Sequence, residues 1–195
     1  MKIIGLTGLT GAGKSTVARK LMAYGCYHID ADTVAREVIN GDEKVKRKLK
    51  ERFGDDVIGT NGAVNRPVLA ERAFADNLST NDLNSITHPA VTEKIKKIID
   101  EKKDLGYSGI IIDAIALFES GENELCDFTV AVTAPEDIRL QRIIKRDKIT
   151  EEKALSRIRA QKNEEFFTKR ADFIIWNYEP YNLDTEIRQI ISNLQ

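Results

Sequence analysis

Residues 8–15 have the sequence Gly-Leu-Thr-Gly-Ala-Gly-Lys-Ser, which matches the pattern G-x-x-x-x-G-K-S of a phosphate-binding loop. Glycines let the backbone bend so that successive N–H groups point into one concavity, where an anion can bind. A lysine at this spacing reaches the β- and γ-phosphates of a nucleoside triphosphate, and the serine hydroxyl can ligate Mg²⁺. The residues expected to bind the nucleotide are Gly8, Gly11, Ala12, Gly13, Lys14, Ser15 and Thr16, with Lys14 also acting in catalysis.

Aspartates follow two predicted strands at points that share one edge of a parallel sheet. Asp30 and Asp32 come directly after the apolar segment 27–29, and Asp113 ends the segment 109–113. Ligands bind where the carboxyl ends of parallel strands meet, so we expect these carboxylates near the phosphate loop. Asp32 is the candidate base for an acceptor hydroxyl, and Asp113 is a candidate ligand of Mg²⁺ or of its water. The alternatives are a helix cap at Asp30 or Asp32 and a tight turn at Asp113.

Three arginines are spaced to share one face of a predicted helix that begins at Pro135 and runs to Asp147. Arg139, Arg142 and Arg146 stand at i, i+3 and i+7, which places them within about 60° of one another around the helix axis. Guanidinium groups on such a face can neutralise charge that develops on a transferred phosphoryl group. We expect Arg139 to bind nucleotide and Arg142 and Arg146 to act in catalysis, with a solvated basic face as the alternative.

Three other features favour structural roles. His28 lies inside a predicted strand, which favours a place in the packing. Pro89 suits the first position of a helix, where His88 would make an N-terminal contact. Segment 43–52 contains six basic residues and few apolar ones, which is typical of a solvated helix. The alternative for this segment is a basic surface that meets an anionic acceptor.

The elements that must position these residues alternate between short apolar segments and helical patterns, which predicts βαβ units and a parallel sheet covered on both faces. The predicted strands span residues 2–7, 27–29, 109–113, 128–133 and 173–175. The predicted helices span residues 14–24, 33–39, 43–53, 67–75, 79–104, 135–147 and 183–194, and residues 147–170 form a charged helical excursion. The stretch from 32 to 108 is too long for one crossover helix, so a helical insertion is expected.

Length and composition restrict the classes of protein. The 195 residues suit one domain with an insertion and are too few for a helicase or motor core. A net charge of −1 gives no global attraction to nucleic acid or to a membrane surface, and no apolar run approaches the ~18–20 residues of a spanning helix. Cys26 and Cys126 form neither a metal pattern nor a disulfide framework. A cytoplasmic monomer or weak oligomer is expected.

The phosphate loop alone does not distinguish a phosphotransferase from a regulatory nucleotide switch. A GTPase needs an Asn-Lys-x-Asp guanine reader, and no asparagine in this chain is followed by lysine. A small-molecule kinase fits the length, the insertion and the charged excursion. A kinase of a nucleoside, nucleotide or other small metabolite and a non-catalytic nucleotide-binding switch stay open as alternatives.

The chain resembles dephospho-CoA kinases over essentially its full length. The motifs that carry the resemblance are LTGLTGAGKST (6–16), HIDAD (28–32), NRPVLAERAF (65–74), THPAV (87–91), DAIALFE (113–119), PEDIRLQRIIKRD (135–147), RIRAQ (157–161) and ADFIIWN (171–177). The resemblance implies transfer of the γ-phosphoryl group of ATP to the ribose 3′-hydroxyl of dephospho-CoA, the last step of CoA synthesis, with Mg²⁺.

The resemblance also implies an α/β fold of the P-loop kinase type in three layers. Its five-stranded parallel sheet would have the order 2-3-1-4-5. The core would comprise residues 1–32, 108–147 and 171–195, with a helical substrate-binding insertion over about 33–107 and a helical lid over 147–170.

For the site, the resemblance implies that Asp32 is the base and that Asn177 lies near the adenine of ATP. It places Arg66, His88 and Glu119 on the acceptor side, and it implies that lid arginines close over the phosphates. Ile115-Ala116 replaces the Pro-Leu that the family usually has before this glutamate, which predicts a change of loop shape there.

Overall fold

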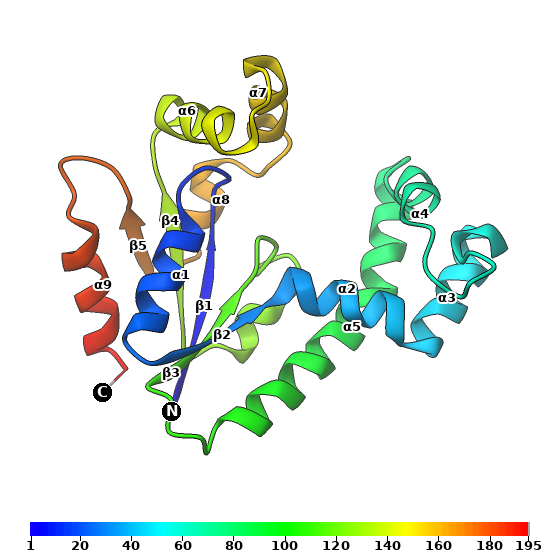
Figure 1. Ribbon diagram of the computed structural model, residues 1–195, viewed down its shortest axis with the longest axis horizontal. Coiled ribbons are helices and arrows are strands. Elements are labelled where there is room, and N and C mark those ends of the chain that lie inside the picture. The colour runs from blue at the N-terminus through cyan, green and yellow to red at the C-terminus, as the bar shows by residue number, and fades with distance from the viewer. Residues whose placement is uncertain (195) are drawn as a thin grey trace. The chain divides into compact units, whose positions relative to one another are not determined.

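Figure 1 shows the computed structural model of the chain, which describes residues 1–194. The chain forms two compact units. The first contains residues 1–29 together with the chain from residue 102 onward, and the second contains residues 30–101. Each unit is built around its own set of secondary-structure elements, and none of the helices within residues 1–194 is long and apolar enough to cross a membrane.

The first unit is built on a five-stranded sheet in the order β2-β3-β1-β4-β5, which confirms the predicted topology. The strands are β1 (Lys2–Gly8), β2 (Cys26–Asp30), β3 (Gly109–Asp113), β4 (Phe128–Thr133) and β5 (Phe173–Trp176). β1 runs parallel to both β3 and β4, and β4 runs parallel to β5. The three isoleucines of β3 are fully buried, as expected of a strand covered on both faces.

The register of the sheet places Asp113 close to the start of the phosphate-binding loop. Asp113 at the end of β3 pairs with Leu6 of β1, and Val132 of β4 pairs with Gly8 of β1. β1 continues directly into the phosphate-binding loop. The carboxylate of Asp113 therefore lies beside the start of that loop, at the strand ends where ligands of α/β folds bind.

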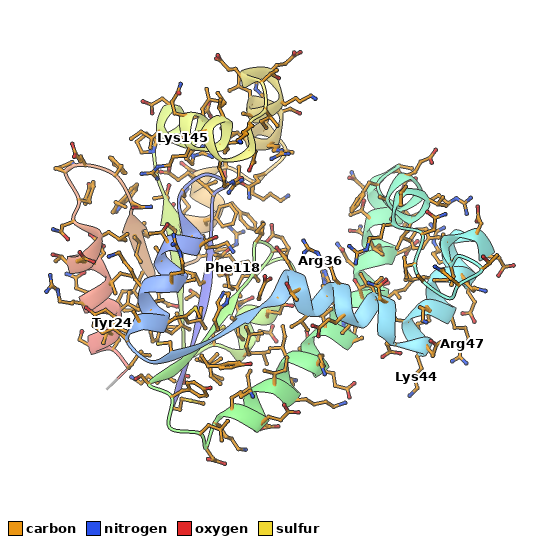
Figure 2. The ribbon with its side chains drawn as sticks, viewed as in Figure 1. Tyr24, Arg36, Lys44, Arg47, Phe118 and Lys145 are labelled. Carbon is orange, nitrogen blue, oxygen red and sulfur yellow. The ribbon has the colours of Figure 1, made fainter. Side chains whose placement is uncertain are left out.

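Helices cover both faces of this sheet (Figure 1). α1 (Lys14–Ala23) and α9 (Leu183–Ser192) contact each other and bury Val17, Leu21 and Ile187 in the main core. α8 (Glu164–Thr168) packs on β4. Its Phe166 meets the ring of Phe118, which Figure 2 labels, edge to face at 6.3 Å. These helices bury the apolar residues of the sheet. Their packing holds the strands in place, and the ends of these strands carry the site.

The charged excursion of the first unit forms a helix pair with a small core of its own. α6 (Glu136–Asp147) and α7 (Glu151–Arg159) lie side by side (Figure 1). Ile143, Ala154 and Ile158 are buried between them. A short turn, η2 (Glu122–Leu125), precedes β4. The amphipathic pattern of α6 therefore buries its apolar face against α7 and leaves its arginines for other contacts.

The second unit consists mainly of helices, with one isolated β-bridge between Ile58 and Val64. It contains α2 (Ala31–Gly41), α3 (Glu43–Phe53), η1 (Asp55–Val57), α4 (Arg66–Ala73) and α5 (Asn77–Lys102), whose last residue belongs to the first unit. α3 buries Val45, Leu49 and Phe53. Figure 2 shows Lys44 and Arg47 pointing outward from α3, and both are exposed. The basic segment is thus a solvated helix with one buried face.

Pro89 was expected to open a helix, and this prediction is wrong, because Pro89 lies inside α5. A proline in a helix lacks the N–H that would bond to the carbonyl of Ser85, four residues earlier. The helix continues because packing on both sides of the proline holds it. Thr87, Val91 and Ile95 are all buried along α5, and such tertiary burial overrides local propensity.

Candidate active site

The phosphate-binding loop connects the end of β1 to the start of α1. Gly8 has φ 147° and Gly13 has φ 98°, values that favour glycine. A Cβ at Gly8 would overlap the Val132 carbonyl, and one at Gly13 would overlap the Asn177 side chain. Gly13 caps α1 without a side-chain hydrogen bond. The start of α1 therefore has no side-chain cap and presents the positive end of the helix dipole, where an anion can bind.

Two donors from outside the loop hold the carbonyl of Ala12. The Nδ2 of Asn177 donates to this oxygen at 2.7 Å, and the Nη1 of Arg142 donates to it at 3.2 Å. Arg142 also donates to the backbone oxygen of Asn177 at 2.8 Å, which links the two braces. In a trans peptide the C=O and N–H point in opposite directions. The N–H of Gly13 therefore points away from these braces.

Arg139 braces the other side of the loop. It is only 7% exposed, its Nε donates to the Ala134 carbonyl at 3.0 Å, and its Nη1 lies 3.5 Å from the Thr10 carbonyl. The N–H of Thr10 donates to the Oε1 of Gln161 at 2.6 Å. Both backbone polar groups of Thr10 are thus contacted by side chains from the α6–α7 region. Gln161 stands in the RIRAQ motif, but its spacing alone gave no sign of this contact.

The carboxylate of Asp113 has two side-chain partners, the ammonium of Lys14 and the imidazole of His28. Its Oδ1 forms an ion pair with the Nζ of Lys14, and its Oδ2 lies 3.0 Å from the Nε2 of His28. The Asp113 side chain is only 9% exposed. Burial opposes ionisation, but the hydrogen bond from His28 and the charge of Lys14 together hold the pKa of Asp113 below its usual value. Asp113 is therefore an ionised carboxylate at neutral pH. His28, for which a structural role was expected, contacts this carboxylate and so lies within the site.

The arginine face predicted for α6 divides into separate contacts. Arg139 and Arg142 are turned to the phosphate loop, whereas Arg146 forms a two-pronged ion pair with Asp147, at 2.7 Å from Nε and 2.9 Å from Nη2. Arg157 of α7 donates to the same carboxylate. These two hydrogen-bonded arginines hold the pKa of Asp147 below its usual value. Asp147 thus pairs with both arginines at the α6–α7 corner, which agrees for Arg146 with the alternative of a solvated basic face paired with this aspartate.

The second unit carries three of the predicted site residues. Asp32 is exposed in the first turn of α2, Arg66 begins α4, and His88 is half-buried in α5. Asp30 is the N-cap of α2, since its carboxylate accepts the N–H of Thr33 at 3.0 Å and the hydroxyl of Thr33 at 2.9 Å. Capping is therefore confirmed for Asp30, and Asp32 does not have that role. Burial lowers the pKa of His88, so its imidazole is neutral at pH 7.

The remaining predicted residues lie in the first unit. Ser15 is exposed in the first turn of α1, and Thr16 follows it. Glu119 is exposed in the turn after β3. In that turn the hydroxyl of Thr7 donates to the Ile115 carbonyl at 3.1 Å, which ties the turn to β1 at the position where the usual proline is absent.

A magnesium ion in such a site needs few protein ligands. Mg²⁺ in kinase sites is held by one or two side chains together with phosphate oxygens and waters. No group of three or more His, Cys, Asp or Glu side chains within residues 1–194 is arranged to hold a metal by itself. The Asp113 carboxylate and the Ser15 hydroxyl are oxygen donors of the kind that Mg²⁺ prefers, so the residues present fit this ion.

Comparison with known proteins assigns the chain to a family. The family model described as dephospho-CoA kinase matches residues 2–181. A curated relative from Corynebacterium diphtheriae, named dephospho-CoA kinase, is 40% identical over 177 residues, which cover 91% of this chain and 88% of the relative.

Two solved structures share the fold over almost the whole chain. A Thermus thermophilus protein has a TM-score of 0.79 and 30% identity, and the match covers 100% of this chain and 98% of that one. A dephospho-CoA kinase from Campylobacter jejuni has a TM-score of 0.70 and 25% identity, with coverage of 98% and 96%.

Proposed function

Because this chain belongs to the dephospho-CoA kinase family, we infer that it catalyses ATP-dependent phosphorylation of dephospho-CoA to CoA, with ADP as the other product. The family match over residues 2–181 carries this conclusion. The braced loop and the Lys14–Asp113 pair supply the chemistry that such a transfer needs, which is a fixed cradle for phosphates beside an ionised carboxylate.

We propose that the loop amides, Lys14 and the first turn of α1 bind the β- and γ-phosphates of ATP. Lys14 would turn from Asp113 toward the phosphates, which leaves this carboxylate and the Ser15 hydroxyl to hold Mg²⁺. A bound Mg²⁺ would neutralise phosphate charge. Arg139 and Arg142 act through the loop, because they fix the peptide groups whose N–H donors face the nucleotide. Asn177 shares this role and lies next to the adenine.

We propose that Asp32 is the general base that takes the proton of the ribose 3′-hydroxyl, and that Arg66, His88 and Glu119 bind the acceptor. Asp32 is suited to this role because it is exposed in the first turn of α2, directly after the strand β2 that ends at the site. A neutral His88 can accept or donate a hydrogen bond without adding charge. The helical segment of about 33–107 is then the substrate-binding insertion.

Residues of about 147–170, which contain α7 and α8, form the proposed lid, and Arg146 of α6 lies directly before it. Replacement of Arg146 by alanine is expected to lower kcat about 10²-fold, the order seen when one charge-stabilising donor is removed from a site, while ATP affinity changes less. The reason is that Arg146 would act on charge that develops during transfer. Steady-state kinetics with both substrates, together with calorimetric ADP binding, measure the two effects.

A matched control for Arg146 is Lys145→Ala, at the neighbouring position of α6. Lys145 is exposed and has no assigned role in the site, so its loss should leave kcat within threefold. Thermal unfolding of Arg146→Ala reports on the ion pair with Asp147. A variant that unfolds earlier yet turns over normally would refute a catalytic role for Arg146.

The acceptor is tested by comparing turnover of the purified chain with dephospho-CoA, nucleoside monophosphates and shikimate in a coupled ADP assay. Dephospho-CoA is expected to raise ATP consumption far above the rate without acceptor. A higher rate with another acceptor would identify a kinase of a different metabolite, and slow hydrolysis that no acceptor stimulates would indicate a nucleotide switch.

We also propose that the protein works in the cytoplasm. Its two cysteines, Cys26 and Cys126, are free thiols, and burial raises the pKa of Cys26 to about 11 and that of Cys126 to about 12. Such thiols are unreactive at neutral pH, which suits a reducing compartment.

A further inference from the structure

His28 contacts the site from β2, whereas the phosphate loop follows β1. β2, which carries His28, is the neighbour of β3, which ends in Asp113. The imidazole Nε2 lies 3.0 Å from the Oδ2 of Asp113. Because Asp113 is ionised, that nitrogen is assigned as the one that carries the proton and donates it. The two oxygens of this buried carboxylate therefore have different partners, Lys14 on Oδ1 and His28 on Oδ2.

The two partners of Asp113 differ in how firmly they are held. Lys14 has a flexible side chain at the start of α1, and the proposed function requires it to reach the phosphates of the nucleotide. His28 sits on a strand of the sheet, with a short side chain and only two rotatable bonds. When Lys14 moves to the phosphates, the contact with His28 is the one that stays with Asp113.

We propose that His28 is a positioning residue for the magnesium–nucleotide site: by holding Oδ2 of Asp113, it keeps Oδ1 directed toward the position that Lys14 leaves. The proposal rests on the proposed function, because it assumes that a nucleotide with Mg²⁺ binds at the loop. Residues that orient metal-binding carboxylates contribute strongly to metal affinity, and their loss typically costs about 10–100-fold. His28 thus acts on the metal through Asp113 and touches neither substrate.

The test compares two substitutions in the full chain. His28→Leu removes the hydrogen bond, whereas His28→Gln keeps a neutral side chain that ends in an N–H donor. ADP binding to each variant is measured by calorimetry in the presence of Mg²⁺ and again with EDTA. For His28→Leu we expect MgADP binding about tenfold weaker and metal-free ADP binding within threefold of the wild type. For His28→Gln we expect both affinities within threefold of the wild type.

The outcomes separate positioning from packing. Equal losses in His28→Leu and His28→Gln, or equal losses with and without Mg²⁺, would overturn the proposal, because a packing defect weakens both forms of the nucleotide alike. Thermal unfolding shows whether each variant is folded at the assay temperature. ADP binding needs no acceptor, so the result does not depend on dephospho-CoA. The acceptor comparison can therefore show that dephospho-CoA is not the acceptor while the role of His28 is confirmed. Equally, dephospho-CoA can prove to be the acceptor while the role of His28 is refuted.

Discussion

Replacement of Asp32 by asparagine is expected to lower kcat for phosphorylation of dephospho-CoA by about 10³, within the 10²–10⁴ range of general-base catalysis, while ATP affinity stays within threefold. Asparagine has nearly the same shape but cannot take the proton of the acceptor hydroxyl. Asp32 lies outside the phosphate loop and is not the cap of α2, so the substitution should spare nucleotide binding and folding. Steady-state kinetics and calorimetric ADP binding check both parts.

The matched control is Asp30→Asn, two residues away in the same HIDAD motif. The carboxylate of Asp30 is engaged by Thr33 through two hydrogen bonds at the start of α2, and asparagine is as good an N-cap as aspartate. We expect Asp30→Asn to keep turnover within threefold. If Asp32→Asn also turns over within a few-fold of the wild type, Asp32 is not the base. Equal large losses in both variants would point to a shared structural cause.

The strands could be predicted closely because each is a short apolar segment with a sharp polar boundary. β3 and β4 have the predicted bounds, and β1 is one residue longer than predicted. The order of the strands was also predicted, although by resemblance to a family rather than by the apolar pattern. Once β2 and β3 are neighbours, residues at the ends of these strands must meet, and this brings His28 to Asp113. A histidine inside one strand carries no local sign of its partner on another.

The braces of the phosphate loop could not be predicted from spacing because their partners are far apart in the chain. Asn177 reaches Ala12 across 165 positions, and Gln161 reaches Thr10 across 151. The helical period of α6 correctly placed Arg139 and Arg142 near each other. It could not tell that they would donate to backbone carbonyls of the loop, since a guanidinium can donate to a carbonyl oxygen as well as to a phosphate oxygen.

The limits of local patterns also explain Pro89. A proline is most often found in the first turn of a helix, but the sequence also predicted one helix over 79–104. The structure follows the second prediction, since α5 passes through Pro89 with Thr87 and Val91 buried. The helix cap, by contrast, could be predicted from the sequence. The alternative that Asp30 caps a helix was correct, and it gives the two aspartates of the HIDAD motif different roles, since Asp32 lies in the first turn of α2.

Replacement of Lys14 by alanine is expected to lower kcat/KM for ATP by about 10³ or more. One lost charge-stabilising donor costs about 10²–10³ in turnover, and Lys14 has a second effect through Asp113. In the wild type the ammonium of Lys14 neutralises this buried carboxylate. Without it, the negative charge of Asp113 faces the phosphates and repels them. Lys20→Ala in the same helix is the matched control, because Lys20 pairs with the exposed Asp184 and should be nearly silent.

A double variant separates the two effects of Lys14. If repulsion by Asp113 contributes, Lys14→Ala/Asp113→Asn should bind metal-free ADP more tightly than Lys14→Ala alone, because the uncompensated charge has been removed. Turnover should stay low in both, since neither has the ammonium that stabilises the transferred phosphoryl group. Metal-free ADP binding by calorimetry measures the first expectation. The same affinity in the single and double variants would mean that Asp113 does not act on the phosphates, and that the whole loss in Lys14→Ala comes from the missing ammonium.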